Sequence, residues 1–155
     1  MANRHLGRTI IMQSLYQWDF RGKDTAALQV ALEQNLKEFA PEFDDVSFIE
    51  STVNGILTNA GDIDKVITTY APQWPIEQIT LVDRTVLRIG VYELKFNPAI
   101  PARVAINEAI ELAKTFGGES SGKFINGVLG AIYRDALAAG DIKEVDKQKG
   151  EETKK

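Results

Sequence analysis

A lysine and a phenylalanine beside a glycine-serine turn are the residues of this chain best suited to binding chemistry. Lys123 and Phe124 follow the sequence GGESSG, and residues 104–129 read as a helix, a short turn and a second helix. Free backbone N–H groups at the start of a helix bind anions, and an aromatic ring stacks on an unpaired base. The combination indicates a surface for a phosphate backbone and a base, as in single-stranded nucleic acid.

The same turn nearly spells a phosphate-binding loop. Residues 117–123 fit the pattern G-x-x-x-x-G-K, with which that loop begins in nucleotide hydrolases. The motif then requires Ser or Thr as a magnesium ligand, but this chain has Phe124. The segment before the glycines also has helical rather than strand periodicity. We therefore do not expect nucleotide hydrolysis.

Residue types that serve other catalysis, metal binding or cofactor binding are scarce. The chain has no cysteine and one histidine, His5. Disulfides, thiolate nucleophiles and cysteine-ligated metals are thereby excluded, and the place of His5 among arginines suits a phosphate contact. Glu108 and Glu111 form an acidic pair without a nearby histidine, which a solvated helix face explains. We expect no catalytic residue, no metal site and no cofactor.

Charge is distributed unevenly along the chain. The net charge is −4, but residues 1–23 carry four basic residues and one acid, whereas residues 24–65 carry nine acids and two lysines. The basic first segment can form a surface that binds phosphate. The acidic segment can form a second surface, which faces solvent or binds a basic partner. The alternative interpretation of this charge distribution is an ordinary solvated surface of mixed charge without a binding role. Arg4 and Arg8 flank the apolar stripe of the first helix, so we expect them near the edge of the core.

Apolar residues recur at helical spacing over almost the whole chain, and no strand alternation competes. We predict helices over about 3–20, 25–40, 45–70, 75–95, 101–116 and 120–139, with a division of the third at Gly61-Asp62 left open. Pro75 is expected to be the first residue of the fourth helix, which is apolar nearly all round and should be buried. A break at residues 71–75 separates a front half from a back half.

Glycines near the turn have predictable roles. Gly117 is placed to form the left-handed cap of the helix before it, and Ser120 or Ser121 can accept N–H bonds at the start of the next helix. Gly127 and Gly130 lie inside that next helix, at a cost of about 1 kcal/mol each relative to alanine. We expect close approach of another helix to offset this cost.

Length and composition fit one domain. The 155 residues are 44% hydrophobic, which is enough for a substantial core. Residues 141–155 contain five lysines and five acids with few apolar residues, so we expect a charged tail after a domain that ends near residue 140, disordered beyond its first few residues. The chain has no apolar run of membrane-spanning length and no signal-peptide pattern. We therefore expect a cytoplasmic protein without a membrane span.

Three segments together resemble the NusB family of bacterial transcription antitermination factors. They are LYQWDF (15–20), VDRTVLRIGVYEL (82–94), and a run that begins at Pro101, continues through VAINEAIELAKTF and ends with KFINGVL at residue 129. The likeness extends over residues 3 to about 137. It implies an all-α fold of two roughly perpendicular three-helix bundles in one compact domain, with the front bundle over about 3–70 and the back bundle over about 75–139.

The resemblance also implies a function. It implies binding of the boxA element of nascent RNA together with NusE, a small-subunit ribosomal protein, in an antitermination complex on RNA polymerase that also supports ribosomal RNA transcription. The implied role is not enzymatic, and its implied partners are single-stranded RNA, NusE and the polymerase complex. Some relatives self-associate, so a homodimer is left open.

The resemblance places RNA contacts at both ends of the domain. The arginine-rich N-terminal segment of the family corresponds to Arg4, His5 and Arg8, although Leu6 stands where some relatives have a further arginine. The aromatic residue that meets RNA corresponds to Phe124, and Ser120 replaces an acid of some members. In this interpretation Phe124 stacks on a base, and four cations neutralise phosphates: Arg4, Arg8, Lys114 and Lys123.

The partner face implied by the resemblance lies on two other helices. The family residues that face NusE correspond to Asp83 on the fourth helix and Tyr16 on the first. One alternative is a helical interaction module that reaches RNA only through its partner, which the acidic residues 24–65 would support. Another is an RNA-modifying enzyme, because NusB-like domains also precede methyltransferase domains. This chain has no glycine-rich cofactor-binding strand–loop–helix after that region, so we do not expect the enzyme.

Overall fold

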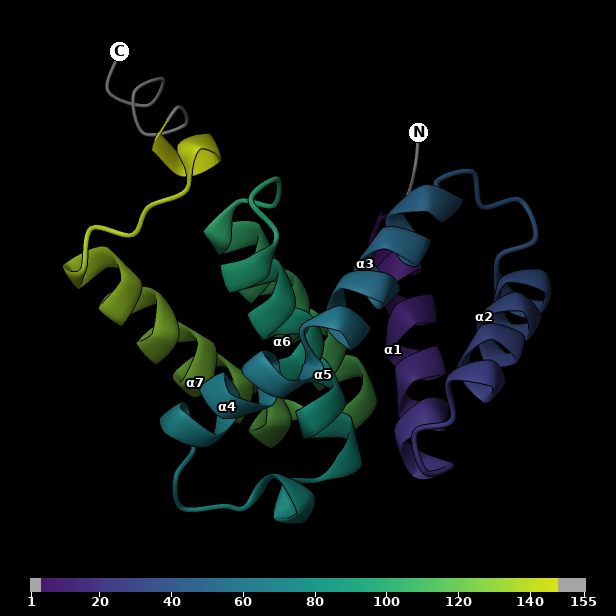
Figure 1. Ribbon diagram of the computed structural model, residues 1–155, viewed down its shortest axis with the longest axis horizontal. Helices are drawn as coiled ribbons and strands as arrows, with labels where there is room; N and C mark the ends of the chain where they lie inside the picture. The colour runs from purple at the N-terminus through teal and green to yellow at the C-terminus, as the bar shows by residue number, and fades with distance from the viewer. Residues whose placement is uncertain (1–3, 148–155) are drawn as a thin grey trace.

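Helices make up almost all of the computed structural model, which describes residues 4–147 (Figure 1). The α-helices are α1 (Arg4–Phe20), α2 (Thr25–Phe39), α3 (Val46–Thr58), α4 (Ala60–Tyr70), α5 (Leu81–Val91), α6 (Ala102–Gly117) and α7 (Glu119–Ala138). A 3-10 turn, η1 (Ile76–Gln78), precedes α5, and a π-helical turn, η2 (Tyr92–Phe96), follows it. Residues 4–147 contain no strand, so the predicted all-α fold class is confirmed.

Two groups of helices meet along α1 and α5. Helix α1 packs against α2 and α3, while α5 packs against α4, α6 and α7. Figure 1 shows α1, α2 and α3 toward the right and α4 to α7 toward the left. We expected the whole segment up to residue 70 in the front bundle, but α4 packs mainly against α5 and α7. The front group therefore ends at Thr58, and the chain divides at Asn59 rather than at Gly61-Asp62.

Helix α5 is the central element, as its all-round apolar pattern predicted. Every residue from Thr85 to Val91 is buried. The helix begins later than predicted, because Pro75 leads into the 3-10 turn and Thr80 caps α5 instead. The Thr80 hydroxyl accepts a hydrogen bond from the backbone N–H of Asp83 at 3.2 Å. This cap sets where the half-buried first turn of α5 lies.

Close contact between helices occurs at Gly90 and not at the glycines that we predicted. A Cβ atom on Gly90 would lie 2.7 Å from Cδ1 of Leu129 and 3.2 Å from Cβ of Ala109. Among the described residues, nothing lies within 4 Å of a Cβ on Gly127, and only the Arg134 side chain approaches one on Gly130, at 3.6 Å. The expectation for Gly127 and Gly130 was wrong, because both face away from the contact that α7 makes with α5.

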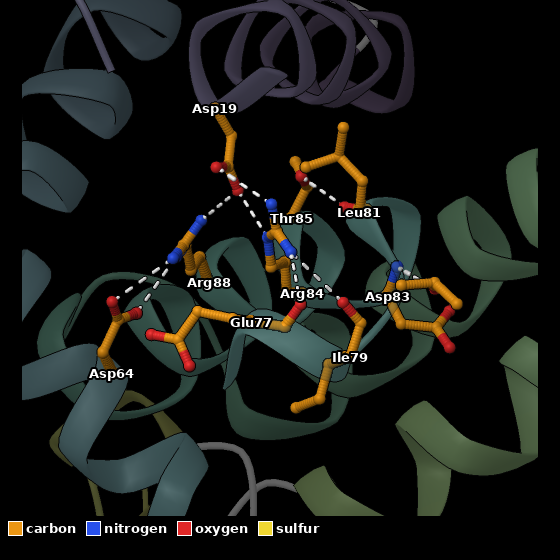
Figure 2. Close-up of polar contacts among 10 residues, drawn as sticks. Asp19, Asp64, Glu77, Ile79, Leu81, Asp83, Arg84, Thr85 and Arg88 are labelled. Carbon is orange, nitrogen blue, oxygen red and sulfur yellow. Dashed lines mark hydrogen bonds and ion pairs between the residues drawn. The ribbon is translucent and has the colours of Figure 1, made fainter. Parts of the chain in front are cut away.

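An ionic network joins α1, α4 and α5 (Figure 2). Asp19 of α1 accepts hydrogen bonds from Nε and Nη2 of Arg84 at 2.7 and 3.1 Å, and from Nη1 of Arg88 at 2.6 Å. Arg88 also donates to both carboxylate oxygens of Asp64 in α4, at 3.0 and 3.3 Å. The side chains of Asp19 and Arg88 are almost fully buried. The network therefore ties α4 to α5 and, through the same two arginines, α5 to α1.

The segment after α7 is docked on the domain as far as the described residues extend. The Lys143 ammonium donates to three backbone carbonyls, those of Glu93, Asn97 and Ile100, at 2.7, 2.8 and 2.5 Å. The Asp146 carboxylate accepts from the backbone N–H of Ala102, at the start of α6. The ordered part of the tail therefore reaches Asp146, further than the few residues that we expected, and the rest of the prediction falls on residues 148–155, outside the described part of the chain.

We expect the buried network to make stability depend on pH in acid. Burial alone would raise the pKa of Asp19, but hydrogen bonds and charge from Arg84 and Arg88 hold this pKa below its ordinary value of 3.8. Because the folded pKa lies below the unfolded one, the stabilisation is complete above the unfolded pKa and is lost as the pH falls through the folded pKa.

Urea unfolding of the protein and of Asp19→Asn from neutral pH down to about pH 2.5 measures this effect. At neutral pH the variant should lose about 3–5 kcal/mol of unfolding free energy, since the partly buried Arg84 loses its carboxylate partner and the buried Arg88 retains only Asp64. The difference between the two proteins should shrink at the acid end. A difference that stays constant with pH would contradict the role given to Asp19.

Candidate nucleic-acid interface

The turn between α6 and α7 lies where we predicted it, but different residues shape it. Gly118 adopts the positive φ of 91°, while Gly117 is still the last residue of α6. Helix α7 begins at Glu119 without a side-chain cap, so neither Ser120 nor Ser121 fills the predicted capping role. Ser121 instead packs against Gly117 and leaves no room for a side chain there. The glycine with a positive φ is thus one residue later than predicted, and its ψ of −175° is extended rather than left-handed helical.

Two lysines and an aromatic ring come together at the start of α7. The Lys114 side chain crosses Gly122, where a Cβ atom would lie 2.9 Å from Lys114 Cγ. Lys114, Ser120 and Lys123 are exposed, and Phe124 is half-buried against the core. Within residues 4–147, neither lysine ammonium has a hydrogen bond or an ion pair. Both positive charges are therefore available to an anion.

A pocket of about 350 Å³ opens beside Phe124. Its lining residues come from the segment before α5, from α5 and from α7: Trp74, Gln78, Ile79, Thr80, Asp83 and Phe124. The sequence reasoning missed Trp74, which is 52% exposed. The sequence feature that could have identified Trp74 is its place in the Pro-Gln-Trp-Pro break, where the residue belongs to no apolar helix face that would bury it.

Asp83 has an unsatisfied carboxylate at this pocket. Its Oδ1 atom is shielded from solvent and has no hydrogen-bond partner among the described residues. Figure 2 shows the Asp83 carboxylate apart from Arg84 and Arg88, with no dashed line reaching it. The acid that we predicted for a protein partner therefore shares a pocket with Phe124.

Tyr16 lines a second pocket, of about 440 Å³, that adjoins the first. Its walls come from α1, α2, α5 and α6: Met12, Gln13, Tyr16, Gln17, Asn35, Phe39, Val82 and Phe116. Phe39 is largely exposed, and the buried Oε1 of Gln13 has no partner within residues 4–147. Val82 faces this pocket and the next residue, Asp83, faces the other. The first turn of α5 therefore separates two neighbouring surfaces.

Arg4 and His5 lie at the far end of α1 from Tyr16, roughly 16 Å along the helix axis. The Arg4 Nε donates to Oδ2 of Asp45 at 3.3 Å, and its guanidinium carbon lies 4.5 Å from the centre of the Phe48 ring. His5 Nδ1 lies 3.1 Å from Oε2 of Glu108 in α6. Both residues are exposed. They are accessible to a ligand, but a phosphate would have to compete with Asp45 and Glu108.

Arg8 does not belong to this surface, which corrects its predicted role as a phosphate contact. Only 3% of the residue is exposed. Its Nε and Nη2 donate to Oε1 and Oε2 of Glu93 at 2.8 and 2.9 Å, a bidentate pair inside the protein. The position beside the apolar stripe of α1 hinted at burial, but nothing local in the sequence identified Glu93 as the partner.

Residues 4–147 offer little for metal binding or membrane crossing. They contain no group of three or more His, Cys, Asp or Glu side chains arranged to hold a metal ion. None of the helices in this range is both long and apolar enough to span a bilayer. The features available for binding on the surface near the start of α7 are the unpaired Lys114 and Lys123, exposed aromatic rings and two pockets.

Comparison with known proteins gives one consistent result. The model of the NusB family matches residues 5–134. A transcription antitermination protein NusB from Bacillus cereus (strain B4264) is 46% identical over 134 residues, which cover 86% of this chain and 98% of that protein.

Solved structures agree with the sequence comparison. NusB of T. maritima superposes with a TM-score of 0.78 at 34% identity, over 96% of this chain and 99% of that one. A chain in a crystal structure of antitermination factors NusB and NusE in complex with double-stranded RNA gives a TM-score of 0.76 at 28% identity, over 85% of this chain and 96% of that one.

We expect Arg8→Met to act on stability rather than on ligand binding. The substitution leaves the Glu93 carboxylate buried without its partner, so the unfolding free energy should fall by about 3–5 kcal/mol in urea titrations. Arg4→Met is the matched control, because Arg4 is exposed and its ion pair should contribute no more than about 1 kcal/mol. Equal, small losses in both variants would contradict the assignment of Arg8.

Proposed function

Because the chain belongs to the NusB family, we propose that it is a transcription antitermination factor that binds boxA-type single-stranded RNA together with the ribosomal protein NusE. The observation that assigns RNA binding to particular residues is the cluster of Lys114, Lys123 and Phe124 at the start of α7. The related structure of NusB and NusE with double-stranded RNA supports the choice of NusE and of RNA as partners, and the single-stranded form is proposed from the aromatic ring of Phe124.

RNA binding needs charge and stacking at this cluster. The two unpaired lysine ammonium groups neutralise phosphates. The first backbone N–H groups of α7 add hydrogen-bond donors that also favour an anion. Ser120 contributes a hydroxyl without the negative charge of an acid. Phe124 stacks on an unpaired base, which contributes about 1–3 kcal/mol per base in proteins of this kind.

Arg4 and His5 extend the RNA surface along α1. Their ion pairs with Asp45 and Glu108 are exposed, and exposed pairs contribute little to stability. A phosphate can therefore replace either carboxylate at small cost. A strand that contacts both Lys123 and Arg4 would run along α6, since Glu108 of that helix contacts His5.

NusE binding is assigned to the pocket around Tyr16. Phe39 and Phe116 give this pocket apolar walls, and Gln13 supplies a buried acceptor without a partner. Because the pocket adjoins the RNA surface at Val82 and Asp83, a bound NusE can touch the same RNA strand. Because NusE and RNA would then contact each other, bound NusE changes the affinity for RNA, and bound RNA changes the affinity for NusE by the same factor.

We assign no catalytic step to the protein and place it in the cytoplasm with the transcribing polymerase, where it also supports ribosomal RNA transcription. A binding role is sufficient because recognition of an unpaired strand requires only positioned charges and rings. The alternative is an interaction module that reaches RNA only through NusE. Titration of RNA with the protein in the absence of NusE separates the two, because only direct binding gives a signal there.

We expect Lys123→Ala and Phe124→Ala to weaken RNA binding in different ways. Loss of a phosphate contact should flatten the slope of log affinity against log salt by about 0.7, the value for one charge on a single strand. Loss of the ring should cost about 1–3 kcal/mol of binding free energy with the slope unchanged. Fluorescence anisotropy of labelled boxA RNA over a salt series measures both quantities. Unchanged affinity in both variants would exclude the start of α7 as the RNA site.

We expect Tyr16→Ala to weaken NusE binding and to leave RNA binding in the absence of NusE unchanged. A ring that anchors an interface contributes about 2 kcal/mol, or roughly thirty-fold in affinity. Phe20→Ala is the control, because Phe20 lies on the same helix outside the pocket and is 75% exposed. Isothermal titration calorimetry with purified NusE makes the comparison. Similar effects of the two substitutions would place NusE elsewhere.

A further inference from the structure

We propose that the turn between α1 and α2 is a second contact for single-stranded RNA, in which Phe20 stacks on a base and Arg21 and Lys23 hold phosphates. The inference rests on the RNA-binding function proposed above. It extends the RNA surface to residues 20–23, the α1–α2 turn, which have no role in that function so far. Phe20 is the last residue of α1, and α2 begins at Thr25.

An aromatic ring stands out from the protein at the end of α1. Phe20 is 75% exposed, more than any other large apolar side chain in the described part of the chain. One exposed phenylalanine is ordinary on a protein surface and would need no explanation by itself. Here two exposed cations, Arg21 and Lys23, follow it within three positions. A ring beside cations is suited to an unpaired strand, because the ring stacks on a base and the cations neutralise phosphates.

The two cations are not engaged by carboxylates. Among the described residues, neither the Arg21 nor the Lys23 side chain forms an ion pair or a hydrogen bond. Asp19 is buried in the network of Figure 2, and the Asp24 carboxylate accepts from the first backbone N–H groups of α2 at 3.0 and 3.5 Å. A phosphate can therefore reach either cation without displacing an ion pair. Two free charges of one sign favour such a strand over a protein interface, where lysine is depleted.

The backbone of the turn holds Lys23 in an unfavourable conformation. The N–H of Lys23 donates to the carbonyl of Trp18 at 2.8 Å, and φ is 85° at Gly22 and 66° at Lys23. Within residues 4–147, Lys23 is the one residue other than glycine with a positive φ. Glycine adopts this conformation more readily than a residue with a side chain. A lysine that is kept where glycine would be favoured points to a use for its ammonium group.

The α1–α2 turn continues the surface that begins at the start of α7. Phe20 follows Tyr16 by four positions, so the two side chains are neighbours on α1. Tyr16 lines its pocket together with Phe116, near the end of α6, and α7 begins directly after α6. A strand held at the start of α7 can therefore continue past the Tyr16 pocket to the α1–α2 turn. NusE in that pocket would lie beside the strand.

The test uses the whole protein and fluorescence anisotropy with two labelled uridine RNAs. Lengths of about 6 and about 20 nucleotides bracket the usual footprint of a single-strand site. The short RNA cannot span both contacts, whereas the long RNA can. Phe20→Ala and Lys23→Gly alter the turn. Lys37→Ala is the control, because Lys37 is an exposed lysine near the other end of α2, and Lys123→Ala removes the contact at α7.

Both turn variants should bind the long RNA more weakly. Phe20→Ala should lose about tenfold in affinity without a change in salt dependence, since the ring carries no charge. Lys23→Gly should flatten the slope of log affinity against log salt by about 0.7. Its melting temperature should stay the same or rise, because glycine suits the positive φ. Weaker binding by a protein of undiminished stability excludes misfolding as the cause.

The short RNA and the control variant should behave differently. Affinity for the short RNA should change little in the turn variants, because that RNA can bind at the start of α7 alone. Lys37→Ala should leave the affinity for both RNAs nearly unchanged, since Lys37 lies outside the turn.

Three results would overturn the proposal. They are unchanged binding of the long RNA in both turn variants, losses no larger than in Lys37→Ala, and weaker NusE binding in the turn variants with RNA binding intact. The last result would assign the turn to the protein partner. In each case the proposed RNA-binding function stands if Lys123→Ala weakens binding of both RNAs. Failure of the unaltered protein to bind either RNA, with or without NusE, would instead overturn that function, and the second contact with it.

Discussion

The charge pairing between α1 and α5 is the constraint on which the rest of the structure depends. Arg8 pairs with Glu93 at one end, and Asp19 pairs with Arg84 and Arg88 at the other, so the two helices run antiparallel in a single register. A buried charge without a partner is far more costly than a paired one, so slippage by even one helical turn is strongly disfavoured. The hydrophobic core alone would tolerate other registers, because apolar contact is not directional.

The register of α1 on α5 decides how the binding surfaces are arranged. It brings Tyr16 beside Val82, and the Thr80 cap leaves Asp83 on the opposite side of the same turn. The α6–α7 turn then adds Phe124 to the Asp83 side. The two pockets, which carry the proposed surfaces for a protein and for RNA, thus lie next to each other at one helix end.

Arginine and lysine have different roles in this protein. Arg8, Arg84 and Arg88 are held inside by carboxylates, whereas Lys114 and Lys123 are exposed and unpaired within the described residues. The planar guanidinium forms bidentate pairs at low cost in a buried site, while the strongly hydrated ammonium suits a solvated phosphate contact. The basic N-terminal segment therefore contributes less free charge than its composition implies.

The sequence by itself determined the helices and the turn that carries Lys123 and Phe124, because periodicity, caps and glycines act over a few residues. It also determined the family, through segments long enough to be specific. Only the tertiary structure decided that Arg8 is a buried ion-pair partner, that α4 lies with the back group and that Lys143 docks the segment after α7. Only the folded chain also places Trp74 beside Asp83. Each of these depends on partners distant in the sequence, and local spacing carries no information about which distant groups will meet.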